Sequence, residues 1–455
     1  MNKGWTELHA AILTEIFNSL DHNKIKWLVV RNYIDLPKKN HSADVDVAIK
    51  KSDWVASSKL ILEIFLSNGF LYYDLKRYQY ILCYTFFDTH GNGFKLDLFD
   101  CNEYRGLVTN SFDDLYDSSI LTQQSVRGSS ELHNVVIIFI RSLLSVGIVK
   151  ERYIPEILNY CSCNKLSVID ELSKLFNPSI AEAIVGKLCD NDVRSITNEK
   201  SRLRRILLLN NIKSRGLKTL TSYLNHYICT FKTRCAMRKS KCFISVMGAD
   251  GAGKTTFLDA LTLGLATIYS VHEIEDKCKV YHHRPTMFPN LGHVAQKAKI
   301  MEADTDFSRP HRAKPVGFLS SLVRMVYYWM DYLIGGVIIL RKNAKNDRFT
   351  IFDRYIYDFL VDPYRSRINL PYWLRTTFTR LVPQPRIVFI LTTDAEIIHR
   401  RKQELSIEEI ERQNCELTKL AATSSRFVML DASKSPNELA REALNVIIDR
   451  FTTKI

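Results

Sequence analysis

The stretch FISVMGADGAGKTT, residues 243 to 256, decides the fold of the carboxyl-terminal half of the chain. An apolar strand candidate leads into a glycine-rich loop, and a helix-forming run follows, which is the context that a phosphate-binding loop requires. The loop glycines allow successive backbone amides to converge on phosphate oxygens at a helix N-terminus, which carries partial positive charge. The sequence therefore predicts a nucleoside triphosphate site.

Within this loop we expect Lys254 to reach the β- and γ-phosphates and Thr255 to hold Mg²⁺. ATP and Mg²⁺ are accordingly the expected cofactors. The alternative interpretation, a glycine-rich turn that binds nothing, is disfavoured because all fixed positions and both flanks agree. The residues expected around the nucleotide are Gly248, Ala249, Asp250, Gly251, Ala252, Gly253, Lys254, Thr255 and Thr256.

Length, net charge and cysteine content limit the possible number of domains and the possible partners. The 455 residues leave room for about three domains. A formal net charge of +14 favours anionic partners such as nucleotides, phosphorylated substrates, RNA or an acidic membrane surface, although a solvated basic surface is the alternative. The ten cysteines lack a paired metal spacing, so we expect reduced thiols in a cytoplasmic protein.

The apolar segments do not predict a signal peptide or a transmembrane span. The first ten residues, MNKGWTELHA, lack a continuous apolar core, and the longest uncharged apolar run, Tyr332 to Leu340, is about half of the ~20 residues that a bilayer requires. We expect the stretch Met325 to Leu340 to form a buried helix, with peripheral membrane contact as the alternative.

Three regions are expected along the chain. Residues 1–125 alternate β-rich and helical runs and predict an α+β domain with a hairpin turn at residues 89–93. Residues 126–238 have helical periodicity and end in a basic linker. The runs noted in the first region are Trp27 to Val30, Asp44 to Ile49, Leu60 to Leu66, Tyr80 to Phe87 and Phe94 to Phe99.

Residues 239–455 predict an α/β domain. Continuous apolarity of its strand candidates is typical of a parallel sheet with helices on both faces. A nucleotide would then bind at the carboxyl edge of the first strand. The strand candidates are Phe243 to Met247, Lys279 to His282, Phe349 to Phe352, Arg386 to Leu391 and Phe427 to Leu430.

Four segments of this domain resemble thymidylate kinases: KCFISVMGADGAGKTTFLDAL at 241–261, KVYHHRP at 279–285, FDRY at 352–355 and RRKQELSIEEIERQ at 400–413. The resemblance is greatest to a thymidylate-kinase-like subfamily often encoded near bacterial surface-polysaccharide genes, in which DRY is followed by a segment like IYDFLVDPYRSR at 356–367. It implies a P-loop kinase fold and phosphoryl transfer.

Charged residues in these segments suggest roles in that chemistry. Asp353 and Arg354 follow a strand at the ligand edge of the sheet, so the carboxylate could organise Mg²⁺ and the guanidinium could grip an acceptor phosphate; a structural ion pair is the alternative. The resemblance implies that Arg284 holds the acceptor monophosphate and that Asp250 lies near the acceptor sugar. His282 and His283 beside Arg284 are either site or packing residues.

The stretch at 400–413 resembles a kinase lid, whose arginines close over the triphosphate and stabilise the transferring charge. The catalytic candidates there are Arg400, Arg401 and Arg412, and the alternative is an ordinary exposed helix with intrahelical salt bridges. The thymine-contacting arginine and glutamine pattern is missing, and residues 309–332 form an insert-like segment in that region. We therefore expect an acceptor other than thymidylate: a sugar phosphate, a lipid-linked or glycan hydroxyl, or another nucleotide.

A second metal site is predicted near the amino terminus. Asp44 and Asp46 lie at i and i+2 in a strand-like run, so their side chains share a face, and Asp97 could add a third carboxylate from a neighbouring strand. Residues 20–105 thereby resemble the nucleotidyltransferase superfamily. Arg31 and Asn32 replace the glycine and serine that this family normally places before the first aspartate, which leaves either an active transferase or a substrate-binding domain.

The leading hypothesis is an ATP- and Mg²⁺-dependent phosphotransferase that acts on a nucleotide, a sugar phosphate or a glycan-related acceptor, joined to a nucleotidyltransferase-like domain. The first alternative is a nucleotide-regulated binding or assembly protein with degenerate catalytic domains. The second is a nucleotidyltransferase that acts on RNA or another substrate, which leaves the kinase motifs unexplained; nucleic acid is accordingly the less favoured partner.

Overall fold

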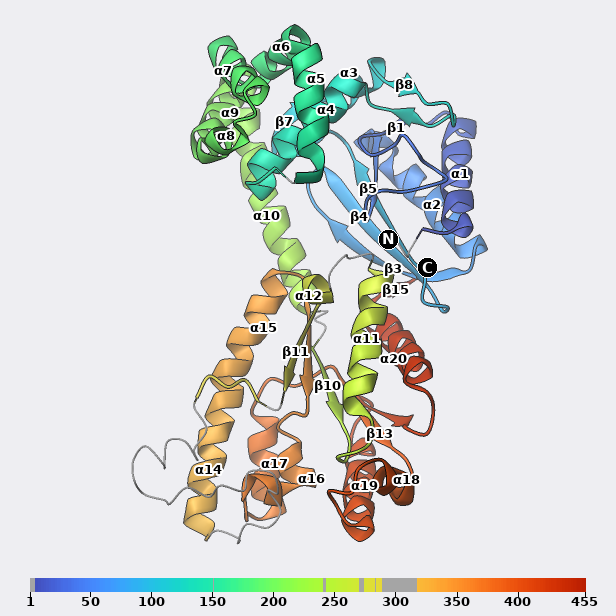
Figure 1. Ribbon diagram of the computed structural model, residues 1–455, viewed down its shortest axis with the longest axis vertical. Helices are drawn as coiled ribbons and strands as arrows, with labels where there is room; N and C mark the ends of the chain where they lie inside the picture. The colour runs from blue at the N-terminus through green and yellow to red at the C-terminus, as the bar shows by residue number, and fades with distance from the viewer. Residues whose placement is uncertain (1–4, 150, 240–242, 270–273, 283, 289–316) are drawn as a thin grey trace. The chain divides into compact units, whose positions relative to one another are not determined.

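The computed structural model describes residues 5–149, 151–239, 243–269, 274–282, 284–288 and 317–455. Expectations that concern the first four residues, His283 and residues 309–316 lie outside this part of the chain. The chain divides into two compact units, Met1–Cys235 with Thr453–Ile455, and Ala236–Thr452, which are described separately (Figure 1).

The first unit contains a mixed sheet whose order within the described residues is β15-β3-β4-β5-β2-β1-β9-β8. The β4–β5 hairpin turns at residues 89–92, as the sequence predicts, and β2 runs parallel to β5. The strands are β1 Trp27–Val29, β2 Val45–Ile49, β3 Phe70–Arg77, β4 Ile81–Asp88, β5 Gly93–Phe99, β8 Ile120–Leu121, β9 Arg127–Gly128 and β15 Thr453–Lys454, and a separate pair is β6 Asn102–Tyr104 and β7 Leu107–Asn110.

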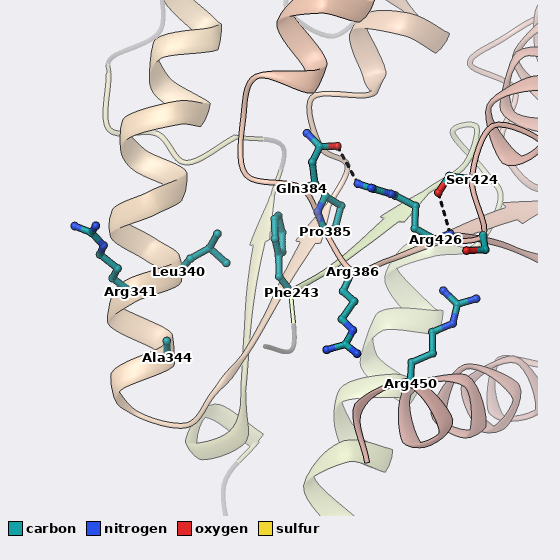
Figure 2. Close-up of a pocket in the computed structure, with 11 residues that line it drawn as sticks. Phe243, Leu340, Arg341, Ala344, Gln384, Pro385, Arg386, Ser424, Arg426 and Arg450 are labelled. Atoms are coloured by element: carbon teal, nitrogen blue, oxygen red, sulfur yellow. Dashed lines mark hydrogen bonds between the residues drawn. The ribbon is translucent and has the colours of Figure 1, made fainter. Parts of the chain in front are cut away.

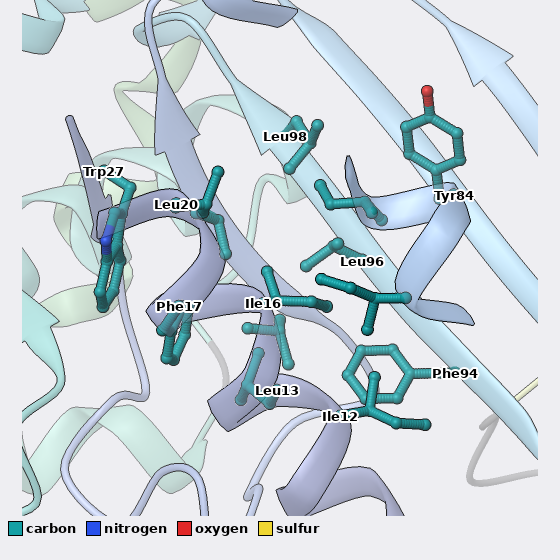
Figure 3. Close-up of a cluster of buried hydrophobic side chains, with 14 of the residues drawn as sticks. Ile12, Leu13, Ile16, Phe17, Leu20, Trp27, Tyr84, Phe94, Leu96 and Leu98 are labelled. Atoms are coloured by element: carbon teal, nitrogen blue, oxygen red, sulfur yellow. The ribbon is translucent and has the colours of Figure 1, made fainter. Parts of the chain in front are cut away.

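Two helices cover one face of this sheet. Helix α1, Glu7–His22, buries apolar residues at helical spacing, and Figure 3 shows Ile12, Ile16 and Leu20 beside Phe94, Leu96 and Leu98 of β5. Helix α2, Trp54–Ser67, adds Phe65, whose ring stacks on Phe86 at 3.6 Å between centroids. The run Leu60 to Leu66 is thus helical, and this packed layer fixes the register of β5 beneath it.

The region after the sheet is helical, as expected. A helix with a wide apolar face, α4, packs with residues of α5 to α9 around a buried cluster that includes Leu143, Leu172 and Val185. The helices of this part are α3 Phe112–Asp117, α4 Glu131–Arg141, α5 Ile154–Cys163, α6 Lys165–Leu175, α7 Pro178–Cys189, α8 Val193–Asn198, α9 Lys200–Arg215 and α10 Leu217–Lys239.

The second unit contains the predicted parallel sheet. Its order within the described residues is β11-β12-β10-β13-β14, and every neighbouring pair is parallel. The strands are β10 Phe243–Met247, β11 Cys278–His282, β12 Phe349–Asp353, β13 Ile387–Thr392 and β14 Phe427–Asp431, each within one residue of its expected start. Because the strands are parallel, all their carboxyl ends meet at one edge.

Helices lie on both faces of this sheet. On one face Phe243, Met247 and Phe352 pack with residues of α14, α15, α17 and α19. On the other, Phe257 of α11 contacts Phe389 of β13, and α20 packs on α11. The helices are α11 Lys254–Ile268, α12 Ile274–Lys277, α14 Phe318–Met330, α15 Gly336–Lys345, α16 Asp358–Val361, α17 Tyr372–Arg380, α18 Ala395–Arg401, α19 Ile407–Ala421 and α20 Pro436–Phe451.

The expected helix at Met325 to Leu340 is part of a longer one. Helices α14 and α15 are joined by a π-helical turn, Asp331–Gly335, into a continuous run from Phe318 to Lys345. Within the described residues this run alone has the length and composition of a candidate membrane span, with mean hydropathy 1.3, a test that core helices of soluble proteins also pass. Met325 and Tyr332 on one face of the run are buried, but Met330, Ile334 and Ile338 are exposed, so the expectation of a buried helix is correct for one face only.

Candidate functional site

The glycine-rich loop joins β10 to α11 at the carboxyl edge of the parallel sheet. A Cβ at Gly248 would lie 2.7 Å from the carbonyl oxygen of Leu391 in β13, so only glycine fits between the strand end and the loop. Gly253 has φ +85° and caps the N-terminus of α11 in the left-handed region. The loop backbone is thereby held at a helix N-terminus, where an anion is stabilised.

Lys254 lies inside this loop. Its Nζ donates hydrogen bonds to the carbonyl oxygens of Gly248 at 2.9 Å and Ala249 at 2.8 Å, and the residue is only 8% exposed. Burial and the positive charge of Arg354 together lower the pKa of Lys254 to about 8, against the attraction of Asp250. A phosphate group beside Lys254 would favour the charged form of the amine.

Asp250 joins two arginines from later segments of the chain. Its Oδ1 accepts a hydrogen bond from Nη2 of Arg354, and its Oδ2 accepts one from Nη1 of Arg365 at 2.7 Å. Burial raises the pKa of Asp250, but the charges of Arg354, Lys254 and Arg365 outweigh burial, so the net pKa is lowered. Both carboxylate oxygens are therefore engaged with guanidinium groups of the protein.

Arg354 is held on three sides. Its backbone has φ +68°, in the left-handed region that non-glycine residues rarely adopt, and its amide donates to the carbonyl oxygen of Val246 in β10. Its Nη1 donates to Oδ2 of Asp358 at 3.1 Å. Burial opposes the charge of Arg354, but Asp358 and Asp250 raise the pKa of the guanidinium. The side chain is thus a fixed cation next to Lys254.

Asp353 ends β12 at the same edge of the sheet. Its Oδ2 lies 3.1 Å from Nδ1 of His282, the last residue of β11, whereas its Oδ1 is buried without a hydrogen-bond partner among the described residues. Thr255 and Thr256 are exposed on the first turn of α11. A hydroxyl and a carboxylate with a spare oxygen are ligands that suit Mg²⁺, so these residues fit the expected metal.

Arg284 lies beyond the carboxyl end of β11 but is engaged with the long apolar helix. Its Nη1 donates to Oδ2 of the fully buried Asp331 at 3.1 Å, and its guanidinium lies over the ring of Tyr328. Asp331 also accepts hydrogen bonds from the backbone amides of residues 286–288. Arg284 therefore anchors this segment to the π-helical turn.

The lid-like segment forms the end of α18, a short turn and the start of α19. Arg401 donates to the carbonyl oxygen of Ala432, and Arg412 donates to the carbonyl oxygen of Val361 and to Glu409 within its own helix. The exposed Arg400 bonds to the carbonyl oxygen of Glu396 at 3.4 Å. These three arginines are thus spread over separate contacts rather than gathered on one point.

The turn after α18 nevertheless lies against the phosphate-binding loop. A Cβ at Gly251 would lie 3.0 Å from the carbonyl oxygen of Ile398 and 3.1 Å from the Cβ of Lys402. The end of α18 and the loop are therefore in direct contact. Of the sequence-predicted residues, the structure brings Asp250, Lys254 and Arg354 into one group of contacts, with Asp353 adjacent to Arg354 in the chain.

Two further residues contact the group formed by Asp250, Lys254 and Arg354, and neither was expected from the sequence. Asp358 and Arg365 complete the contacts of Arg354 and Asp250. Both belong to the segment IYDFLVDPYRSR, whose density of charged residues directly after a strand end is the local signal that could have identified them.

The amino-terminal unit brings its three aspartates together. Asp46 of β2 pairs with Asp97 of β5 in the parallel register, and Asp44 immediately precedes β2. One carboxylate oxygen from each lies within 4.8 Å of the other two. Oδ1 of Asp46 and Oδ1 of Asp97 are buried and have no hydrogen-bond partner among the described residues. The cluster therefore has the ligand type and spare oxygens that a divalent cation requires.

Cations of the protein border this cluster. Nε of Arg31 contacts Oδ2 of Asp46, and Nζ of Lys95 lies 3.4 Å from Oδ2 of Asp44. Burial raises the pKa of Asp97 to about 7, assisted by the charges of Asp44 and Asp46 and opposed by Lys95. Burial also raises the pKa of Asp44, but Lys95 and Arg31 outweigh it and lower the net pKa. Asp97 thus holds its proton more tightly than Asp44 does.

Comparisons with known proteins give little beyond this geometry. No protein-family description matches the chain, and no curated protein matches it. Among solved structures, the chain is similar to the crystal structure of thymidylate kinase from Ehrlichia chaffeensis. The match covers 46% of this chain and 98% of the kinase chain, with 19% sequence identity and a TM-score of 0.31. A match at this identity and TM-score carries no argument about function.

Proposed function

We propose that the second unit is an ATP- and Mg²⁺-dependent phosphotransferase. The observation that supports this proposal is the group formed by Lys254, Asp250 and Arg354 at the glycine-rich loop, where two buried cations and a helix N-terminus meet at the carboxyl edge of a parallel sheet. Phosphoryl transfer requires little covalent help from a protein, so fixed positive charge and positioning are the main requirements.

The residues of the loop have separable roles in this proposal. The backbone amides and Lys254 bind the β- and γ-phosphates, and Mg²⁺ held near Thr255 and Asp353 neutralises their charge. Asp250 acts by holding Arg354 and Arg365 in place, because both of its oxygens are occupied by them. Arg354, fixed by Asp358, then presents a charge to the phosphoryl group or to an anionic acceptor.

For the acceptor we propose a nucleotide, a sugar phosphate or a glycan-related molecule, in the cytoplasm. The fixed guanidinium groups of Arg354 and Arg365 support an anionic acceptor, since planar guanidinium groups bind phosphate oxygens in pairs. Arg284 forms an ion pair with the buried Asp331, so in this proposal its first role is to anchor its segment, and binding of the acceptor is its second role.

The test is transfer of label from γ-labelled ATP by the full chain to nucleoside monophosphates, sugar phosphates and glycan extracts. Asp353→Asn should lower transfer on the order of 10²-fold, because a negative ligand at the phosphate edge is lost. Asp431→Asn is the matched control, since Asp431 ends β14 at the same edge but is exposed. If ATP binds and no acceptor is labelled, a nucleotide-regulated binding protein is the better conclusion.

A second candidate function is favoured by one observation in the first unit. The in-register pair Asp46 and Asp97, each with an unpartnered buried oxygen, together with Asp44 supports a divalent-cation site of the kind used in nucleotidyl transfer. Arg31 and Lys95 form ion pairs with carboxylates that would bind the cation. The competing interpretation of this cluster is therefore an ion-pair network without a metal. Metal titration separates the two accounts, as argued below.

A further inference from the structure

A separate pocket opens at the amino edge of the parallel sheet in the second unit. Its volume is about 1020 Å³, and its wall includes Phe243 at the start of β10, Arg386 immediately before β13 and Arg426 immediately before β14. The phosphate-binding loop follows the other end of β10, roughly 16 Å away at ~3.3 Å per residue. We call this cavity the amino-edge pocket.

The polar lining of the amino-edge pocket is cationic. It contains four arginines, a glutamine amide and two serine hydroxyls, and no carboxylate among the described residues that line it. These polar residues are Arg341, Arg386, Arg426, Arg450, Gln384, Ser424 and Ser425. Guanidinium groups gathered without carboxylates repel one another, and an oxyanion relieves this repulsion while accepting their hydrogen bonds.

The arginines differ in how they are held. Arg426 donates from Nη1 to Oε1 of Gln384 at 3.2 Å, and Arg386 lies over the ring of Phe451. Arg450 makes no hydrogen bond or ion pair with any residue that the structure describes. Leu340 of α15 points toward Phe243 (Figure 2).

Helix dipoles account for only part of this arrangement. Arg450 lies in the last turn of α20, where a cation complements the partial negative charge of the helix C-terminus. Arg386 and Arg426 lie at the entrances of two strands, and strands carry no comparable dipole. Helix capping therefore does not explain why all three arginines line the same cavity.

The opposite wall is apolar. Phe243, Leu340 and Ala344 lie on the side of the cavity away from Arg426 and Arg450, and Pro385 lies between Gln384 and Arg386 (Figure 2). A free phosphate would use the guanidinium groups but would leave this wall in contact with water. A molecule with an anionic end and an apolar or planar end satisfies both walls.

We propose that the amino-edge pocket is a second binding site for a phosphate-bearing small molecule of the nucleotide class, independent of the phosphate-binding loop. Arg426 and Arg450 bind the phosphate groups, and Phe243, Leu340 and Pro385 contact the base. Because the two sites lie at opposite edges of one sheet, occupancy of this pocket does not require a functional loop, and the proposal stands whether or not the second unit is a kinase.

The experiment titrates the full chain carrying Lys254→Ala with ADP and with pyrophosphate by calorimetry, since this substitution weakens the loop site. We expect ADP to bind in the amino-edge pocket more tightly than pyrophosphate. Adding Arg426→Gln and Arg450→Gln should weaken ADP at least about tenfold, because charge-assisted hydrogen bonds are lost. Arg441→Gln, which removes the same charge at an exposed position of α20 that does not line the cavity, should leave ADP affinity unchanged.

Thermal unfolding of each variant establishes that it is folded before titration. Equal ADP affinity in the Arg426→Gln, Arg450→Gln variant and the Arg441→Gln variant would overturn the site. Pyrophosphate binding as tightly as ADP would overturn the assignment of the apolar wall to a base. Absence of ADP binding to the folded Lys254→Ala chain would overturn the existence of the site, because this variant keeps the whole amino-edge pocket.

Discussion

Nη2 of Arg354 donates a hydrogen bond of 2.5 Å to Oδ1 of Asp250, although 104 residues separate them in the chain. The bond ties the segment after β12 to the phosphate-binding loop after β10. Arg365 reaches the other oxygen of the same carboxylate. Asp250 is thereby the point at which two cations are fixed beside Lys254, and its removal should affect the fold as well as the chemistry.

Asp250→Asn should lower the free energy of unfolding of the second unit by roughly 3 kcal/mol, because a nearly buried guanidinium loses a charged partner. Arg365→Gln removes the more exposed pair and should cost only about 1 kcal/mol. Urea titration followed by pulsed hydrogen exchange of peptides from β10 to β13 measures both. Equal losses in the two variants would show that Asp250 does not organise Arg354.

Lys254→Ala should lower single-turnover phosphoryl transfer from ATP by on the order of 10² to 10³, since one fixed charge contact to the moving phosphoryl group is lost. The fold should persist, because the side chain bonds only to carbonyl oxygens of its own loop besides the nearby Asp250. Lys419→Ala, at an exposed position on α19, is the control. Unchanged transfer in a folded Lys254→Ala chain would refute the kinase proposal.

The sequence was sufficient to predict the parallel sheet because its strands are continuously apolar and each is bounded by helical periodicity. It also predicted that Asp44 and Asp46 share a face, since side chains alternate along a strand, and that Asp97 could join them from a neighbouring strand. The structure pairs Asp46 with Asp97 in the register of β2 and β5. Strand β3, Phe70–Arg77, was not predicted, because its apolar start is only four residues long, charged residues follow it, and most of its side chains are only half-buried.

Hydrogen-bond partners that lie far apart in the chain could not be predicted from local sequence patterns. Nothing near Arg284 indicates that a fully buried Asp331 accepts its hydrogen bond, because the two are joined only through the packing of the π-helical turn. The same holds for Arg401, which bonds a carbonyl oxygen at residue 432. Sequence spacing placed these residues on the right elements, and tertiary packing decided what they contact.

Asp97→Asn should weaken Mn²⁺ binding to the full chain at least about tenfold, because an anionic oxygen ligand is replaced by a neutral amide. Asp117→Asn, at an exposed position in the same unit, should leave the affinity unchanged. Electron paramagnetic resonance of free Mn²⁺ measures both, in the Lys254→Ala background so that the loop contributes little. If the wild-type chain binds Mn²⁺ no more tightly than the Asp97→Asn chain, the aspartates belong to an ion-pair network with Arg31 and Lys95 and not to a metal site.

Glu171 offers a pH-dependent test of the helical region. Its Oε1 accepts from Asn110 at 2.9 Å and lies 3.3 Å from Nε2 of His133, and its Oε2 lies 2.6 Å from Nζ of Lys174. Burial raises the pKa of Glu171, but hydrogen bonds from His133 and Lys174 outweigh burial and lower the pKa to about 2. The folded state therefore binds this proton more weakly than the unfolded state.

A carboxyl whose pKa is lower in the folded state stabilises the fold above its unfolded pKa, here near 4.5, and loses that contribution as the pH falls toward about 2. Glu171→Gln should cost on the order of 3 kcal/mol from pH 7 to about 5, and the cost should shrink below about 4.5. Glu182→Gln, exposed on α7, is the control. Urea titration with pulsed hydrogen exchange of peptides from α4 to α9 measures the difference, and a cost that stays constant down to pH 3 would contradict the assigned pKa.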